Sequence, residues 1–287
     1  MYHKSMICLS IVFFLLIICC NDTPAAPFFA DSFESGSLSY TANGARWANS
    51  VATSVTSERA HTGSRSLRFL FAANGTGDSF AEQRFDLGTR KNGVYIRFYI
   101  YFPTNYHHRN VSPNNNKLIR LWSDEANYSG DPIKMGASFE SGTISRLFPE
   151  ANKTYISSQW EAQCSGSIGG IQSLPNMGTW QLTSTELGKW ICFEFHIKRD
   201  TGTGDGAFEF WVNGIKQFGS TNLTFNGAPC APGYFKFGYL LGWSNSGFDQ
   251  NVSIYIDDVA FSDTYIGPIG TASGPNSTSI IDYSYTK

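Results

Sequence analysis

The chain has 287 residues, a net charge of −2 at pH 7, and an aromatic content of 15%. This near-neutral charge excludes a basic field spread over the whole protein, so we expect no nucleic-acid partner. Its 28 glycines favour many short strands joined by turns over long helices.

The N-terminal segment 1–26 has the pattern of a secretory signal peptide. His3 and Lys4 precede an apolar run from Met6 to Cys20, and small residues follow the run. The run has about 15 residues, fewer than the roughly 20 of a membrane-spanning helix. We therefore expect a secreted, extracellular protein. Lipidation of one of the two cysteines that end the run, which would anchor the protein at the cell surface, is the alternative.

The remaining sequence divides into a domain and a tail. Residues 27–268 suit one all-β domain of about 240 residues, whereas residues 269–287 are rich in Ser, Thr and Gly and predict a flexible tail. Three cysteines lie beyond the signal segment, and this odd number allows one disulfide and one spare thiol. They are Cys164, Cys192 and Cys230.

Alternation of apolar and polar residues predicts the strands. The clearest example is Val94–Pro103, which has the period of a strand with one face in a core. Further strands are expected at 67–71, 79–87, 117–122, 133–139, 155–164, 190–198, 208–214, 234–240 and 253–261. About a dozen strands without an internal repeat indicate a two-sheet β-sandwich of the jelly-roll type.

The second face of Val94–Pro103 is unusual for a solvent-facing surface. It carries Arg97 among Tyr95, Tyr99 and Tyr101. Phenols and a guanidinium can stack on sugar rings and hold a carboxylate or sulfate. A sheet face covered by a loop, with Arg97 in a structural ion pair, is an equal alternative.

Several segments resemble one family. They are FADSFESGSL, HTGSRSLRF, YIRFYIYFP, WICFEFHIKRDTGTGDGAFEFWVNG, YFKFGY and IDDVAFSDTYIGP, spread over residues 28–268. Together they resemble the heparin lyase I-like polysaccharide lyases. The resemblance implies a concanavalin A-like jelly roll of the lectin and glucanase type. It also implies β-elimination on an acidic polysaccharide that contains uronic acid, by a monomer with no required cofactor and no protein partner.

The resemblance also implies roles for particular side chains. It makes His196 the candidate base and places Lys236 in contact with the acidic sugar. The lyase reaction needs a group that neutralises the C5 carboxylate, a base that removes the C5 proton, and an acid for the leaving oxygen. Arg97 and Arg120 are the candidate neutralisers, with Gln163 as a weaker amide candidate. We expect these groups to line a single trough.

The acid is the uncertain part of the pattern. In the family a tyrosine usually stands four residues after the lysine, and here that position is Leu240. The nearby Tyr239 points to the opposite face if the strand is regular, and a bulge at Gly238 would re-aim it. Otherwise the acid must come from Tyr234, or from Tyr99 or Tyr101 on the other strand.

Four further hypotheses stay open. The domain could be a non-catalytic carbohydrate-binding or lectin-like module, or a structural adhesion protein. Glu194 and Glu209 on paired strands could be the carboxylates of a glycosidase. The Asp257–Asp258 pair, above all Asp258, could bind a structural Ca²⁺ together with Glu34, because the first and last strands of a jelly roll meet and hard cations prefer carboxylate oxygens.

Overall fold

The computed structural model describes residues 26–107, 109, 111, 115–124, 135–140, 145–151, 180–201, 203–223 and 234–270. Within these ranges every regular element is a β-strand, and no helix is long and apolar enough to cross a membrane. The strand expected at 155–164 and the signal segment 1–25 lie outside the described residues.

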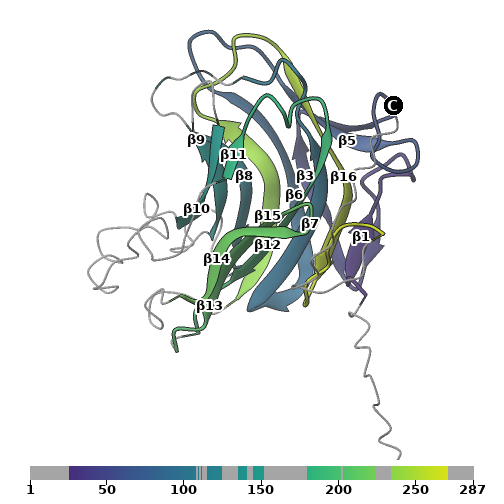
Figure 1. Cartoon of the computed structure of the whole chain (residues 1–287). Coiled ribbons are helices and arrows are strands. Elements are labelled where there is room, and N and C mark those ends of the chain that lie inside the picture. The colour runs from purple at the N-terminus through teal and green to yellow at the C-terminus, as the bar shows by residue number, and fades with distance from the viewer. Residues whose placement is uncertain are drawn as a thin grey trace, which may run out of the picture.

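The strands form two antiparallel sheets, which Figure 1 shows as curved layers stacked face to face. Sheet 1 has the spatial order β14 (Ile215–Leu223), β13 (Gly206–Val212), β12 (Trp190–Lys198), β7 (Gly93–Tyr101), β16 (Val252–Ser262), β5 (Ser66–Phe71) and β4 (Thr53–Thr56), with β1 (Phe29–Asp31) paired to β16. Sheet 2 has the order β11 (Trp180–Leu182), β10 (Ser145–Ala151), β9 (Met135–Glu140), β8 (Asn115–Trp122), β15 (Phe235–Ser244), β6 (Ser79–Lys91), β3 (Ala45–Val51) and β2 (Thr41–Ala42).

The predicted two-sheet jelly roll is confirmed. Strand β7 lies inside sheet 1 between β12 and β16, as its alternating sequence predicts. The turn at Asn213 and Gly214 joins β13 to β14, and both residues have positive φ angles, 50° and 81°, as a tight Asn-Gly hairpin requires. Strands such as β3 and β14 were not expected, and five of the seven residues of β3 and five of the nine of β14 are exposed.

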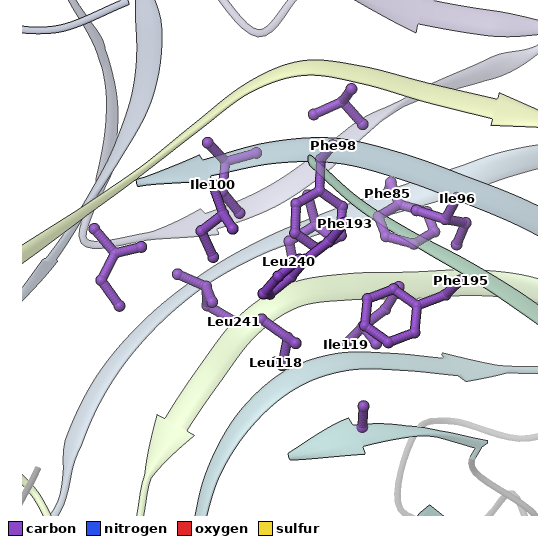
Figure 2. Close-up of a cluster of buried hydrophobic side chains, with 14 of the residues drawn as sticks. Phe85, Ile96, Phe98, Ile100, Leu118, Ile119, Phe193, Phe195, Leu240 and Leu241 are labelled. Carbon is purple, nitrogen blue, oxygen red and sulfur yellow. The ribbon is translucent and has the colours of Figure 1, made fainter. Parts of the chain in front are cut away.

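The core lies between the two sheets and is built from the apolar residues of the alternating patterns. Figure 2 shows Ile96, Phe98 and Phe193 of sheet 1 packing toward Ile119 and Leu240 of sheet 2. All five side chains are fully buried. Residues that alternate with them point away from the core, so each sheet also has an outer face. The predicted site residues that belong to described strands lie on these two outer faces.

Candidate active site

Tyr239 lies in a row of residues that crosses three neighbouring strands of sheet 2. Its Cα pairs with Arg120 on β8 and with Arg84 on β6. Residues directly opposite each other in antiparallel strands point to the same side of a sheet. The neighbours of Tyr239 point the other way: Leu240 belongs to the core, and a Cβ at Gly238 would touch the ring of buried Phe85. The Arg84–Tyr239–Arg120 row therefore lies on the outer face of sheet 2.

A break in the alternation of β15 brings Tyr239 to this face. Phe235 is buried in the core, yet Phe237 lies on the outer side against Trp122, with ring centroids 6.2 Å apart. The pairing with β6 is irregular between Phe235 and Phe237, where β6 passes through Gly88 at a φ of 78°. Tyr239 is thus turned to the outer face, as a bulge would turn it. The irregularity, however, precedes Phe237 and does not lie at Gly238.

Arg84 is the member of the row that reaches solvent, since 36% of its side chain is exposed. Its Nε donates to Oε1 of Glu82 at 2.6 Å, and its guanidinium lies 5.7 Å from the Trp122 ring centre. Burial raises the pKa of the Glu82 carboxyl, while hydrogen bonding and charge from Arg84 oppose the rise. The alternation of β6 already put Glu82 and Arg84 on one face, but neither was assigned a role from the sequence.

Arg120 is fully buried and rigidly held. Its Nη1 donates to the carbonyl oxygens of Ile119 and Ala137 at 3.0 and 2.9 Å, and its Nη2 donates to Ser138 Oγ at 2.9 Å. Its partner on β9 is Gly136, where a Cβ would stand only 1.9 Å from the Ile119 carbonyl oxygen. The two strands therefore approach closely here, and the guanidinium is held by β9.

Lys236 lies at one end of this face. Its Nζ pairs with the Asp86 carboxylate and donates to the Gly88 carbonyl oxygen at 2.8 Å. Arg46 also contacts Asp86, at 3.3 Å. Lys236 therefore ties β15 to β6 through a shared carboxylate, which accounts for its position without a substrate.

Tyr234 lies just before β15. Its hydroxyl donates to Asp124 Oδ1 at 2.9 Å, and the Arg90 guanidinium lies 4.5 Å from its ring centre. The same Arg90 pairs with Asp124 at 3.1 Å. Tyr234 is thus held in a surface cluster beside the strands of sheet 2.

Arg97, Tyr99 and Tyr101 lie on the outer face of sheet 1, where other segments cover them. Arg97 donates to the carbonyl oxygens of Asp258 and Gly267 at 3.0 and 3.4 Å, and each of the three side chains is more than nine-tenths buried.

The groups that cover the two tyrosines come from other segments. The Ile269 N–H donates to the Tyr99 hydroxyl, and the His61 ring stacks on Tyr99. The Arg59 guanidinium lies 3.9 Å from the Tyr101 ring centre. The covered-face alternative describes this surface.

His196 also lies on the outer face of sheet 1, on β12. Its Nδ1 lies 2.8 Å from Glu209 Oε2, and its ring stacks on Tyr95 with centroids 4.1 Å apart. Glu209 in turn pairs with Lys216 at 2.6 Å. The expectation of a single trough is therefore wrong, because His196 and Arg97 belong to sheet 1 whereas Arg120, Lys236 and Tyr239 belong to sheet 2. Gln163 lies outside the described residues.

The carboxylates on sheet 1 serve as hydrogen-bond acceptors for neighbouring segments. Glu194 accepts the N–H groups of Ile266 and Gly267 at 2.7 and 2.8 Å. Its burial raises the pKa of its carboxyl to about 7, although these hydrogen bonds and nearby Arg97 oppose the rise. With Glu209 bound to His196 and Lys216, the pair is occupied within the protein and does not support a glycosidase site.

The groups expected to bind Ca²⁺ are also engaged with donors. Glu34 accepts the N–H groups of Ser64 and Arg65 at 2.9 and 2.8 Å, and Asp258 accepts the Thr62 hydroxyl at 2.7 Å and contacts His61 Nδ1 at 2.7 Å. Across the described part of the chain, no group of three or more His, Cys, Asp or Glu residues could hold a metal ion. The calcium prediction therefore gains no support from these side chains.

Comparison with solved structures finds two polysaccharide lyases with a similar fold. An endo-β-1,4-glucuronan lyase from the fungus Trichoderma reesei is 14% identical, with a TM-score of 0.54, over 83% of this chain and 96% of that one. The alginate lyase Aly36B, in complex with an alginate trisaccharide, is 12% identical, with a TM-score of 0.53, over 83% and 98%. At these identities the likeness establishes the fold alone.

Comparison at the level of sequence gives the family. A search of curated proteins finds no match, whereas the polysaccharide lyase family matches residues 33–260. This range contains both outer faces and all three residues of the Arg84–Tyr239–Arg120 row. The chain belongs to the polysaccharide lyase family.

Proposed function

We propose that this polysaccharide lyase cleaves a uronic-acid-containing polysaccharide by β-elimination on the outer face of sheet 2. The observation that carries the proposal is the Arg84–Tyr239–Arg120 row, in which the tyrosine is paired with an arginine on each neighbouring strand. Guanidinium groups bind carboxylates in a fixed bidentate geometry. A sugar carboxylate held beside Tyr239 would bring its C5 proton to the phenolic oxygen.

Each residue of the row has a place in the reaction. Arg84 binds and neutralises the carboxylate, and the positive charge of buried Arg120 adds to the stabilisation of the negative charge that forms when the C5 proton leaves. Tyr239, acting as a phenolate, takes that proton and then, as a phenol, gives it to the glycosidic oxygen at C4 as the C4–O bond breaks and a C4–C5 double bond forms. One phenol can serve both steps when the proton and the leaving oxygen lie on the same side of the sugar ring.

Several properties complete the proposal. The matched segments of the sequence favour a heparin lyase I-like preference for an acidic substrate, and the two solved lyases act on glucuronan and alginate. The N-terminal pattern favours secretion, with a lipid anchor at the cell surface as the alternative, and we propose a monomer that needs no metal for the reaction. A carbohydrate-binding module without catalysis is the competing proposal.

The test is an assay for the unsaturated product. The protein is incubated separately with glucuronan, alginate, heparin and hyaluronan, and the ultraviolet absorbance of an unsaturated uronate is followed. Tyr239→Phe should lower the rate on the preferred substrate by about 10² to 10⁴. Tyr255→Phe is the matched control, because its hydroxyl bonds Glu58 on sheet 1. Full activity of Tyr239→Phe would refute the role of Tyr239, and glycan retention without new absorbance would favour the binding module.

A further inference from the structure

An exposed tryptophan lies on the same outer face as the proposed reaction site. Trp243, near the end of β15, is 44% exposed. It pairs with Phe80 on β6, and the two rings stack with centroids 4.5 Å apart at 28°. Burying apolar surface is favourable, so leaving a large indole face in solvent has a cost. Because Phe80 supports its other side, the indole presents a flat and rigid surface.

The register connects this stacked pair to the Arg84–Tyr239–Arg120 row. Phe80, Glu82 and Arg84 alternate along β6 with core-facing residues, so they share the outer face of sheet 2. Phe80 precedes Arg84 by four residues, which is about 13 Å along a strand. Gly242 lies between the two places, and a Cβ there would come within 3.1 Å of the Tyr239 ring and 3.4 Å of Glu82.

A pocket of about 490 Å³ lies at the start of β6 and the end of β15, the strand ends that carry Phe80 and Trp243. Its lining comes from the residues just before β6 and just after β15, and includes Thr76, Asp78 and Asn245, together with Arg109. This volume is in the range of small-molecule sites. Arg109 pairs with Asp249 at 3.1 Å, so its positive charge is offset within the protein.

We propose that the Trp243–Phe80 pair and this pocket form a distal subsite that binds a pyranose ring of the same polysaccharide, more than one sugar unit away from the reacting bond. The indole would take the apolar C–H face of the ring, and the hydroxyl, amide and carboxylate groups of the pocket would bond its hydroxyls. Because the charge of Arg109 is offset by Asp249, we expect recognition there not to require a sugar carboxylate. This inference rests on the proposed function, because the sugar bound at the subsite belongs to the polysaccharide that Tyr239 cleaves.

The first test is kinetic and compares Trp243→Ala, Trp243→Tyr and Ile215→Ala. On the polymer that is cleaved best, Trp243→Ala should raise KM about tenfold with a smaller change in kcat, which corresponds to the loss of one modest contact. Trp243→Tyr keeps an aromatic face and should recover most of the affinity. Ile215→Ala, an exposed apolar residue on β14 of sheet 1, is the control. A KM for Trp243→Ala that equals that of the control would overturn the subsite.

The second test measures binding without catalysis, so that it separates the subsite from the proposed reaction. Tyr239→Phe and the double variant Tyr239→Phe/Trp243→Ala are run in native gels that contain glucuronan, alginate, heparin or hyaluronan. The subsite predicts retardation of the single variant in at least one gel and clearly weaker retardation of the double variant. Equal migration of the two variants in every gel overturns it, even if Tyr239→Phe has abolished product formation.

Discussion

Tyr239 on β15 lies directly opposite Arg120 on β8, with both side chains on the outer face of sheet 2. Arg120 is fixed by hydrogen bonds to Ala137 and Ser138, so the guanidinium cannot move to follow a substrate. Arg84, on the other side of Tyr239, is partly exposed and can approach a ligand. Tyr239 therefore has two arginines as cross-strand neighbours: Arg120, which is buried and fixed, and Arg84, which is accessible.

This difference makes Arg84 the cation whose geometry should matter most for substrate binding. Arg84→Lys keeps the charge near Glu82 but loses the planar fork that matches a carboxylate. We expect kcat/KM for the acidic polymer to fall about tenfold or more, which corresponds to roughly 1.4 kcal/mol. The measurement is the initial rate of unsaturated product at several polymer concentrations.

A matched control for this variant exists on sheet 1. Arg68 pairs with Glu58 at 2.7 Å and has a similar side-chain exposure, 30% against 36%. Arg68→Lys should leave kcat/KM within about twofold, because surface ion pairs of this kind contribute only roughly 0 to 1 kcal/mol. Equal losses in the two variants would contradict a specific role for Arg84.

His196 should contribute to stability and not to the reaction. Replacing it with alanine removes the contact with Glu209 and the stacking on Tyr95. We expect the free energy of unfolding to fall by about 1 to 3 kcal/mol, measured by denaturant titration, while kcat stays within about twofold when assayed on folded protein. A loss of kcat comparable to that of Tyr239→Phe would restore His196 as the base.

Gly238 is expected to tolerate no side chain. A Cβ at this position would lie 2.3 Å from Phe85 Cζ and 2.7 Å from the Arg120 carbonyl oxygen. Gly238→Ala should lower the free energy of unfolding by about 1 to 3 kcal/mol through overpacking. Gly75→Ala is the control, since no atom lies within 4 Å of its Cβ position. Equal melting temperatures for the two variants would contradict the close packing of β15 on β6.

Glu194 should make stability depend on pH. The ordinary pKa of a glutamate carboxyl is 4.5, and burial in the folded protein raises the pKa of Glu194 to about 7. The folded protein therefore retains a proton that the unfolded chain releases between these values. The free energy of unfolding should fall as the pH rises through this window, by on the order of 3 kcal/mol.

The variant Glu194→Gln removes this titration. Its free energy of unfolding should be lower at acidic pH, because one acceptor for Ile266 or Gly267 is lost, but it should change less between pH 4.5 and 7. Glu58→Gln, at an exposed carboxylate, should keep the slope of the parent. A slope for Glu194→Gln that matches the parent would show that the carboxyl is ionised throughout.

The sandwich could be predicted because alternation with a period of two is a local property of the chain. The function of an outer face could not be predicted in the same way. Arg97 and Tyr99 have the composition of a sugar-binding surface, yet His61 and Ile269, distant in sequence, cover them. Whether the polar face of a sheet is exposed to solvent depends on other segments of the chain, and the sequence of the strand alone does not reveal them.

The position of Tyr239 shows a second limit. Regular alternation along β15 would place Leu240 outward, whereas the irregular pairing near Phe235 places it in the core. The cause lies on the neighbouring strand, where β6 turns through Gly88. The sequence of a single strand therefore identifies the side chains that alternate but can assign them to the wrong faces of the sheet. The role of Gln163 stays a prediction, since it lies outside the described residues.

The break in alternation before Phe237 also bears on how such a site can change during evolution. A one-residue shift in the strand exchanges the two sides of everything that follows, so an insertion or deletion near Lys236 would carry Tyr239 inward and Leu240 outward without any substitution. An alignment of homologous sequences would then pair a tyrosine with a leucine and suggest that the catalytic acid is lost. The same position in space would nevertheless be filled by the tyrosine at the adjacent place in the sequence.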